Sequence, residues 1–198
     1  MSVFFRLLGF SILVAGLNGC ALFLKEPVAP AVSLAQKKIY DLDSWRLEGR
    51  IGVQTRKDAW HAKLFWEHDG HQDRLRISGP FSQGAVSIIL QDDLIYINEG
   101  NGVVESSRDP DEMLKARLGF AVPLTSLRYW VMGVPSPAAE HTAERGPSGG
   151  INGFRQLGWL LSFERFMNVR DLVLPQKMMI QGNEVKLKLI ADEWVIKG

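Results

Sequence analysis

The chain has 198 residues, and its 46% hydrophobic composition is enough for one domain with a substantial core. Its 23 lysine and arginine residues nearly balance 22 aspartate and glutamate residues, so it lacks the basic excess typical of nucleic-acid binding. The sequence also lacks a polybasic run, the usual sign of a segment that binds anionic lipid headgroups.

The N-terminal segment has the pattern of a secretory signal. Arg6 is the only charged side chain before Cys20, and residues 7–17 are almost wholly apolar. Such a run is too short for a membrane-spanning helix, which needs about 20 residues. The run ends in Leu17-Asn18-Gly19-Cys20, which resembles the lipobox of bacterial lipoproteins.

That resemblance implies cleavage before Cys20 and a lipid anchor on its thiol. Cys20 is the only cysteine, which suits an exported protein without disulfides. An ordinary secreted protein and an uncleaved inner-membrane anchor are the alternatives. We predict a lipoprotein signal peptide over residues 1–19, a lipid-anchored tether over 20–40 and one domain over 41–198.

Strands dominate the predicted domain. Apolar and polar residues alternate with period two over 61–67, 73–78, 85–91 and 184–189, and turn signals such as Asp69-Gly70 and Gly182-Asn183 separate such runs. Period two indicates sheets with one buried face, which favours antiparallel pairing. So many short strands predict a barrel or a strongly curved sheet.

Two helices interrupt the strands. Asp109-Pro110-Asp111-Glu112 is a helix start with an N-cap, a first-turn proline and a glutamate that can reach back, and Gly119 ends this helix. A second helix is predicted over 124–132, before Gly133. Its apolar stripe comprises Leu124, Leu127, Trp130 and Val131. The Pro-, Gly- and Ala-rich stretch 134–153 predicts a long exposed loop.

Little in the sequence indicates catalysis or metal binding. His68 and His71 lie near Asp69 and Asp73, but polar residues are expected at this hairpin turn, and no thiol or second cluster supports a metal site. No nucleophile elbow, phosphate loop, dinucleotide fingerprint or zinc-helix motif occurs. We therefore predict neither an enzyme nor a cofactor.

The aromatic residues leave two interpretations open. Phe81 lies in the turn sequence 79–84 between two alternating strands, where it either contacts a partner or membrane or folds back onto the core. The tryptophans either fill a solid core or surround an apolar cavity beneath a sheet too wide to be filled. The four that bear on this choice are Trp66, Trp130, Trp159 and Trp194.

The order of motifs resembles one family. The stretch Val122-Pro123-Leu124-Thr125-Ser126-Leu127-Arg128-Tyr129-Trp130-Val131-Met132-Gly133-Val134-Pro135 follows Trp45-Arg46-Leu47-Glu48-Gly49-Arg50, Phe65-Trp66 and Gly79-Pro80-Phe81, and precedes Gln156-Leu157-Gly158-Trp159. From about residue 40 to its end the chain resembles the LolB family of outer-membrane lipoprotein receptors. The resemblance implies a mainly β (α+β) fold: an unclosed antiparallel β-barrel with short helices forming a lid over an apolar cavity, shared with the carrier LolA.

The resemblance also implies a function without bond chemistry. LolB proteins accept acylated lipoproteins from the periplasmic carrier LolA and insert them into the inner leaflet of the outer membrane. The expected partners are therefore LolA, lipoproteins and outer-membrane lipids, for a monomer anchored on the periplasmic face of the outer membrane. Ala21, where sorting signals place Asp to retain lipoproteins in the inner membrane, agrees with that location.

The implied sites fall in two regions. Gly79, Pro80 and Phe81 match the family's membrane-insertion loop, where Phe81 replaces a usual Leu. The residues assigned to the acyl cavity or its lid are Leu64, Trp66, Leu127, Trp130, Val131, Trp159 and Trp194, with the helix at 124–132 as a moving part. A lipid-anchored envelope assembly or structural protein with a filled core is the alternative, and an envelope hydrolase is a third possibility.

Overall fold

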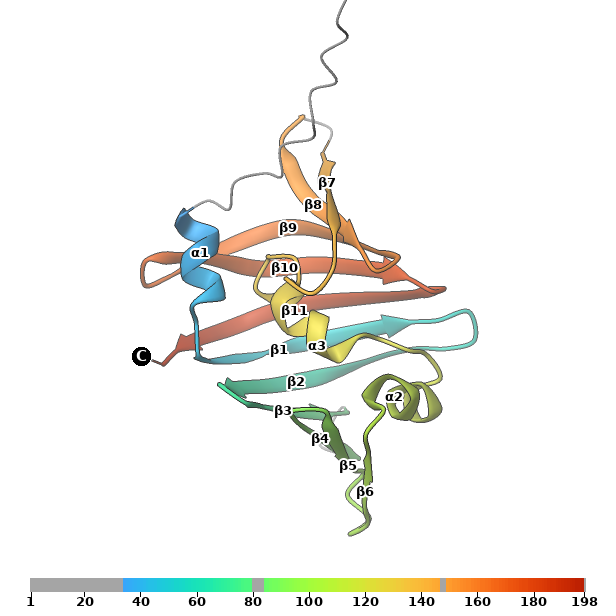
Figure 1. Ribbon diagram of the computed structural model, residues 1–198. Coiled ribbons are helices and arrows are strands. Elements are labelled where there is room, and N and C mark those ends of the chain that lie inside the picture. Colours follow the sequence, from blue (N-terminus) through green and yellow to red (C-terminus); the bar gives the residue numbers. More distant parts are fainter. Residues whose placement is uncertain (1–33, 80–83, 147–148, 198) are drawn as a thin grey trace, which may run out of the picture. The chain divides into compact units, whose positions relative to one another are not determined.

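The computed structural model describes residues 34–79, 84–146 and 149–197, which belong to one compact unit spanning 32–198 (Figure 1). Every strand, helix and buried residue described below lies in this unit, so it contains its own core and all its strand partners. We therefore expect residues 32–198 to fold without the segment that precedes them. Cys20, the predicted signal peptide over 1–19 and the predicted tether up to residue 33 lie outside the described residues, as do Pro80 and Phe81.

One antiparallel sheet forms the body of this unit. Its strands are β1 (Ser44–Gln54), β2 (Ala59–Asp69), β3 (Gln72–Ser78), β4 (Ala85–Gln91), β5 (Leu94–Asn98), β6 (Val104–Ser107), β7 (His141–Arg145), β8 (Ile151–Gln156), β9 (Trp159–Val169), β10 (Leu172–Gly182) and β11 (Val185–Ile196). The spatial order is β6-β5-β4-β3-β2-β1-β11-β10-β9-β8-β7. Because β6 and β7 end this order without pairing to each other, the barrel is unclosed, which confirms the predicted fold class.

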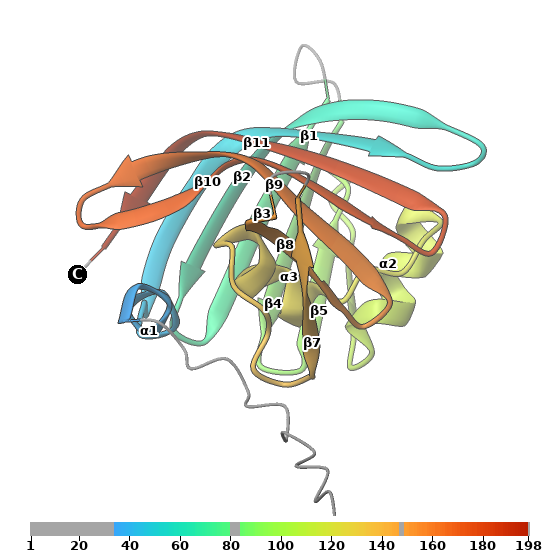
Figure 2. The same cartoon turned by 90° about the horizontal axis from the view of Figure 1, so that it is seen from above.

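The sheet curves into an arch that leaves one face concave (Figure 2). A register shift between Glu48 and Gly49 marks a bulge where β1 pairs with β11. A Cβ at Gly49 would lie 2.2 Å from the backbone oxygen of Ile190, so only glycine permits this close approach of the two strands. The bulge therefore explains the glycine within the motif at 45–50.

Helices α2 (Pro110–Leu118) and α3 (Leu124–Val131) lie against the concave side of the arch, as Figure 2 shows. The predicted cap and end of α2 are confirmed: the Asp109 carboxylate accepts a hydrogen bond from the backbone N–H of Glu112 at 3.0 Å, and Gly119 ends the helix with φ of 81°. The Asp109 N–H donates to Ser107 Oγ at 3.0 Å, and not to Glu112 as the sequence suggested. The predicted stripe of α3 is buried on the sheet. None of the described helices has the length and apolar character needed to cross a membrane.

Two segments without predicted secondary structure contain regular elements. The predicted exposed loop over 134–153 is wrong, because it contains β7 and the start of β8, and because Val134, Pro135 and Ser136 are buried. β7 has one neighbour and mostly exposed side chains, so its sequence carries no alternation to reveal it. Residues 34–40, the end of the predicted tether, form helix α1 (Leu34–Tyr40).

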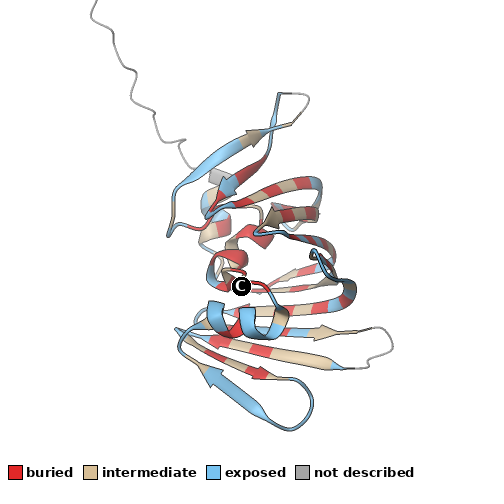
Figure 3. Ribbon diagram, turned by 90° about the vertical axis from the view of Figure 1, so that its right-hand side faces the viewer, coloured by how far each residue is buried: buried red, intermediate tan, exposed pale blue. Residues whose placement is uncertain are grey.

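The core lies between the concave face and the helices. Buried residues alternate with exposed ones along the strands in Figure 3, as period two requires. Trp45 is fully buried, with its ring centroid 5.4 Å from those of both Trp66 and Trp194. The inner face of the sheet is therefore dominated by large aromatic and aliphatic side chains.

Candidate functional site

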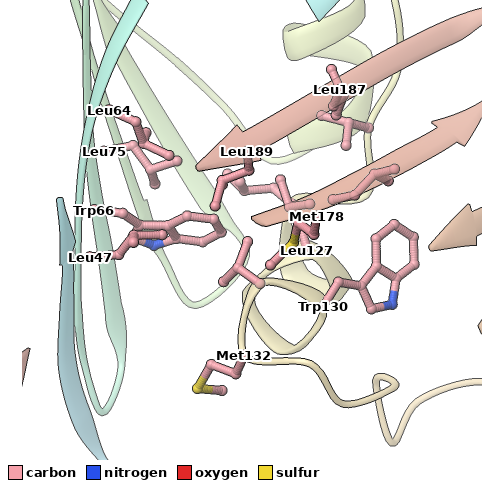
Figure 4. Packing of buried hydrophobic residues seen from close by; sticks show 14 of the residues in the cluster. Leu47, Leu64, Trp66, Leu75, Leu127, Trp130, Met132, Met178, Leu187 and Leu189 are labelled. Atoms are coloured by element: carbon pink, nitrogen blue, oxygen red, sulfur yellow. The ribbon is translucent and has the colours of Figure 1, made fainter. Parts of the chain in front are cut away.

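An apolar cavity of about 50 Å³ lies between the sheet and the helices. Figure 4 shows Leu64, Trp66 and Leu75 on one side of this region and Leu187 on the other, with Leu127 of α3 and Leu189 between them. Every lining side chain is apolar; the full set is Ile51, Val53, Trp60, Leu64, Trp66, Leu75, Ile77, Ile88, Leu114, Leu118, Phe120, Val122, Leu124, Leu127, Ile180, Leu187 and Leu189. The cavity therefore offers a ligand only apolar surface.

The predicted cavity residues occupy two different places. Leu64, Trp66 and Leu127 line the cavity. The other four, Trp130, Val131, Trp159 and Trp194, are at most 5% exposed and lie in the core outside its lining. Their positions are those of supporting residues. The indole of Trp194, for example, donates a hydrogen bond at 3.0 Å to a backbone oxygen of β10.

The cavity is too small for an acyl chain in the described conformation. A volume of about 50 Å³ holds one or two water-sized groups, since each water occupies about 30 Å³ of liquid. By comparison, an engineered cavity of about 150 Å³ in another protein binds benzene. A chain-sized ligand would therefore need a larger cavity than the one in this structure.

A larger hollow, of about 620 Å³, opens to solvent beside the cavity. We call it the mouth; it is lined by residues 55–58, Lys115, 118–121 and 183–185. Leu118 and Phe120 line both the mouth and the apolar cavity. These two side chains therefore form the wall between the cavity and solvent, and displacing them joins the two spaces.

Helix α3 is attached to β3 by a buried polar network. The Asp73 carboxylate is 2% exposed; it accepts a hydrogen bond from the indole N–H of Trp66 at 2.9 Å and contacts Nδ1 of His68 at 3.0 Å. Its second oxygen lies 3.5 Å from Nη1 of Arg128 on α3. The charge of Asp73 is thus compensated across the gap between sheet and helix. The arrangement engages His68 and Asp73 with each other, and among the described residues no group of three metal-ligating side chains forms.

On its other side α3 is attached to β8 through Gln156, which is 2% exposed. The Gln156 Oε1 accepts hydrogen bonds from the indole of Trp130 at 2.7 Å and from the backbone N–H of Ser136 at 2.8 Å. Its Nε2 donates to the backbone oxygens of Ser136 at 2.8 Å and Ala139 at 2.6 Å. One side chain therefore holds both α3 and the segment that follows it.

Helix α2 is held more weakly. Only Met113 and Leu114 of α2 are buried, and Arg117 forms its ion pairs, with Glu99 and Glu105, near the surface. Surface pairs of this kind contribute little, about 0–1 kcal/mol each. Asp111 accepts a hydrogen bond from the backbone N–H at the start of α3, while burial and the neighbouring Asp109 raise its pKa. The two helices thus differ in how firmly the sheet holds them.

Asp73, Arg128 and Gln156 were not identified as site residues from sequence. For the two strand residues, alternation along the strand gives a partial indication. Asp73 lies two residues from the inward-facing Leu75 and Gln156 two residues from the buried Phe154, so each points to the same face as that neighbour. A polar residue on an apolar face needs a partner. Strand alternation therefore indicates that Asp73 and Gln156 are buried, but it does not identify Arg128 and Trp130 as their respective partners.

The predicted insertion loop starts from a described hairpin. Gly79 follows β3 directly, and its backbone N–H lies 3.4 Å from the backbone oxygen of Gly84 before β4. Pro80 and Phe81 lie outside the described residues. Their assignment to membrane insertion stays a prediction.

Comparison with known proteins places the chain in a family. The family model for outer membrane lipoprotein LolB matches residues 43–194. Among curated relatives, the outer-membrane lipoprotein LolB of Chromohalobacter salexigens is 27% identical over 190 residues, covering 92% of this chain and 87% of its own. The LolB of a Marinomonas species is 29% identical over 157 residues, covering 79% and 82%.

A solved structure with low sequence identity shares the architecture. A DUF1329 family protein from Desulfovibrio piger aligns with a TM-score of 0.53 at 7% identity, covering 81% of this chain and 88% of that one, which shows a common fold alone. A LolA superfamily protein from Nitrosomonas europaea aligns with a TM-score of 0.47 at 9% identity, covering 84% and 95%. Since the family model spans well over half of the chain and agrees with the motifs and the unclosed barrel, this chain belongs to the LolB family.

Proposed function

We propose that this protein is an outer-membrane lipoprotein receptor that accepts acylated lipoproteins from the carrier LolA and inserts them into the inner leaflet of the outer membrane. It works as a monomer anchored through Cys20 on the periplasmic face. The observation that carries the proposal is the wholly apolar cavity between the helices and the concave face of the unclosed barrel. The names of the relatives support the membrane and the cargo class.

The energetics favour hand-over between proteins. Each buried methylene contributes about 0.8 kcal/mol, so one acyl chain contributes on the order of 10 kcal/mol. Free passage of such a chain through water is therefore prohibitive, whereas transfer between two apolar cavities avoids the exposure. Net direction requires only that the receptor binds the chain better than the carrier does, and the membrane better still.

Opening begins at α2 in our proposal. The sequence assigns the moving part to the helix at 124–132, but the two buried polar attachments of α3 favour α2 instead. Movement of α2 about Gly119, whose φ is 81°, displaces Leu118 and Phe120 and joins the mouth to the cavity. α3 then stays in place as the inner wall through Leu127.

The decisive experiment is transfer of a radiolabelled lipoprotein from LolA to the purified receptor. We expect Leu118→Glu to lower the transfer rate more than tenfold, because a carboxylate at the wall loses several kcal/mol of hydration when an acyl chain passes. Val173→Glu, an equal change at an exposed position of β10, is the matched control and should transfer normally. Circular dichroism verifies that both variants fold.

Normal transfer by Leu118→Glu would refute the access route through the mouth. Failure of the unaltered protein to bind an acyl probe at all would favour the lipid-anchored assembly protein with a filled core. For the insertion loop, Phe81→Glu should accept cargo from LolA but release it slowly into membranes, whereas Phe81→Leu should release it normally. A Phe81→Glu variant that delivers at the normal rate would contradict the role of the loop.

A further inference from the structure

We propose that the convex face of the sheet around Gly52 is a docking surface for anionic phospholipid headgroups. Figure 2 shows that the described helices all lie below the arch, so the outer face of β1 and β11 carries no helix. Cavity-lining residues and outer-face residues alternate along these strands, so the neighbours of Ile51 and Val53 point outward. The inference uses this outer face alone and does not depend on acyl-chain transfer.

The pairing register collects cations from separate strands. His61 on β2 and Lys188 on β11 both pair with Gly52, and Lys63 on β2 pairs with Arg50 one step away. No polybasic run exists in the sequence, because each strand contributes only one or two of these residues. The sheet thus builds a basic surface that the linear sequence does not display.

Gly52 lies at the centre of a hollow of about 390 Å³ in this surface. The basic side chains around the hollow are Arg50, His61, Lys63 and Lys188, and Gly79 at the start of the β3–β4 turn borders it. Gly52 has no side chain, and a Cβ there would meet nothing nearer than the Cβ of Lys188 at 4.0 Å. Ile51, Ala62 and Ile190 also line the hollow, so it is an apolar depression with basic side chains around it. Glycine is not needed at position 52 for backbone reasons.

Three carboxylates near this part of the outer face already have cationic partners. Asp192 pairs with Arg50 at 2.7 Å, Glu184 pairs with Arg56, and Glu164 pairs with Lys177. Within the described part of the chain, the exposed cations Lys63, Arg76 and Lys186 form no ion pair. Lys188 forms no direct ion pair either, although, after the hydrogen bond from Lys177, its charge helps to lower the pKa of Glu164.

Unpaired, exposed cations are attracted to a negative membrane surface, and each contributes about fivefold to partitioning. The phosphodiester of a headgroup has the charge and the hydrogen-bond acceptors that lysine and histidine donors match. The hollow lies only two residues from Gln54, where β1 ends beside the mouth. Docking of this face therefore brings the mouth of the cavity close to the headgroup layer.

The test measures partitioning of the compact unit, residues 32–198, onto lipid vesicles by sedimentation. This segment lacks Cys20, so a lipid anchor does not contribute. We expect strong binding to vesicles containing phosphatidylglycerol, weak binding to pure phosphatidylcholine, and loss of the difference near 1 M salt, where the Debye length is about 3 Å. Equal binding to both vesicle types at low salt would overturn the proposal.

Two sets of variants locate the surface. The double variant Lys63→Glu with Lys188→Glu should lower partitioning at least about 25-fold. It removes two attractive charges that each contribute about fivefold, and it replaces them with charges that the anionic surface repels. Lys37→Glu with Arg108→Glu, the same charge change at exposed positions away from the hollow, should change it less than about twofold. If both pairs had the same effect, net charge and not this face would govern binding.

A second variant and a competitor complete the test. Gly52→Glu places a carboxylate in the hollow without a steric clash and should lower partitioning at least about fivefold, whereas Gly52→Ala should bind normally. Inorganic phosphate at matched ionic strength should not displace the protein. Full displacement by dilute phosphate would assign the hollow to a free phosphate ion and overturn membrane docking.

Discussion

Replacement of Gln156 by leucine tests how firmly helix α3 is attached to the sheet. The substitution removes four hydrogen bonds, with donor–acceptor distances of 2.6 to 2.8 Å, from a side chain that is 2% exposed. Each such bond contributes about 0.5–1.5 kcal/mol, and a buried donor left unpaired costs about 1–3 kcal/mol. The indole of Trp130 and the N–H of Ser136 both lose their acceptor. We expect the free energy of unfolding to fall by about 3–5 kcal/mol, allowing for partial relaxation.

Urea unfolding followed by circular dichroism and tryptophan fluorescence measures this loss. With a slope of about 2 kcal/mol/M, the midpoint should fall by about 2 M. Gln54→Leu, the same substitution at an exposed position at the end of β1, is the matched control and should change stability by less than about 0.5 kcal/mol. A loss below about 1 kcal/mol for Gln156→Leu would refute the reasoning, because the four bonds would then be dispensable.

Three further predictions follow from the same structure. Gly49→Ala should lose about 1–3 kcal/mol of stability in urea unfolding, since its Cβ would lie 2.2 Å from the oxygen of Ile190, whereas Gly52→Ala on the same strand should be nearly neutral; equal losses would contradict the role of the bulge. Burial raises the pKa of Tyr40, which donates a hydrogen bond at 2.8 Å to the oxygen of Pro135. The Tyr40 hydroxyl should stabilise the fold fully below its unfolded-state pKa near 10, and this stabilisation should be lost as pH rises through the folded-state pKa. The difference in free energy of unfolding between the unaltered protein and Tyr40→Phe should therefore narrow above about pH 10, and a constant difference would contradict this. Hydrogen exchange should be faster in α2 than in α3, and the reverse order would exclude α2 as the first element to open.

The sequence predicts the elements of this fold well where their signals are local. The cap at Asp109 and the alternation along the strands depend on residues within a few positions of each other. The attachments of α3 depend on distant residues: Arg128 and Asp73 are 55 positions apart, and Trp130 and Gln156 are 26 apart. Parity indicates that a polar side chain points inward, but only the folded register identifies its partner.

The cavity could be predicted in character but not in size. Apolar faces on both the strands and the helices require an apolar interior. Its volume of about 50 Å³ depends on how completely side chains such as Leu118 and Phe120 fill the space, and that filling is a three-dimensional packing outcome. The edge strand β7 was missed for a related reason, since a strand with one neighbour and exposed side chains has no apolar period.

Helix α1 and the mouth lie at opposite ends of β1. The chain reaches β1 through α1 and starts the strand at Ser44, whereas the mouth begins at residue 55, just beyond the other end of the strand. At about 3.3 Å per residue, the 11 residues of β1 place these two ends about 33 Å apart. In the proposed receptor, the anchored chain therefore enters β1 at the end opposite to the mouth. Shortening the tether should then reduce how far the receptor reaches from the membrane, while the ligand binding of the cavity should stay the same.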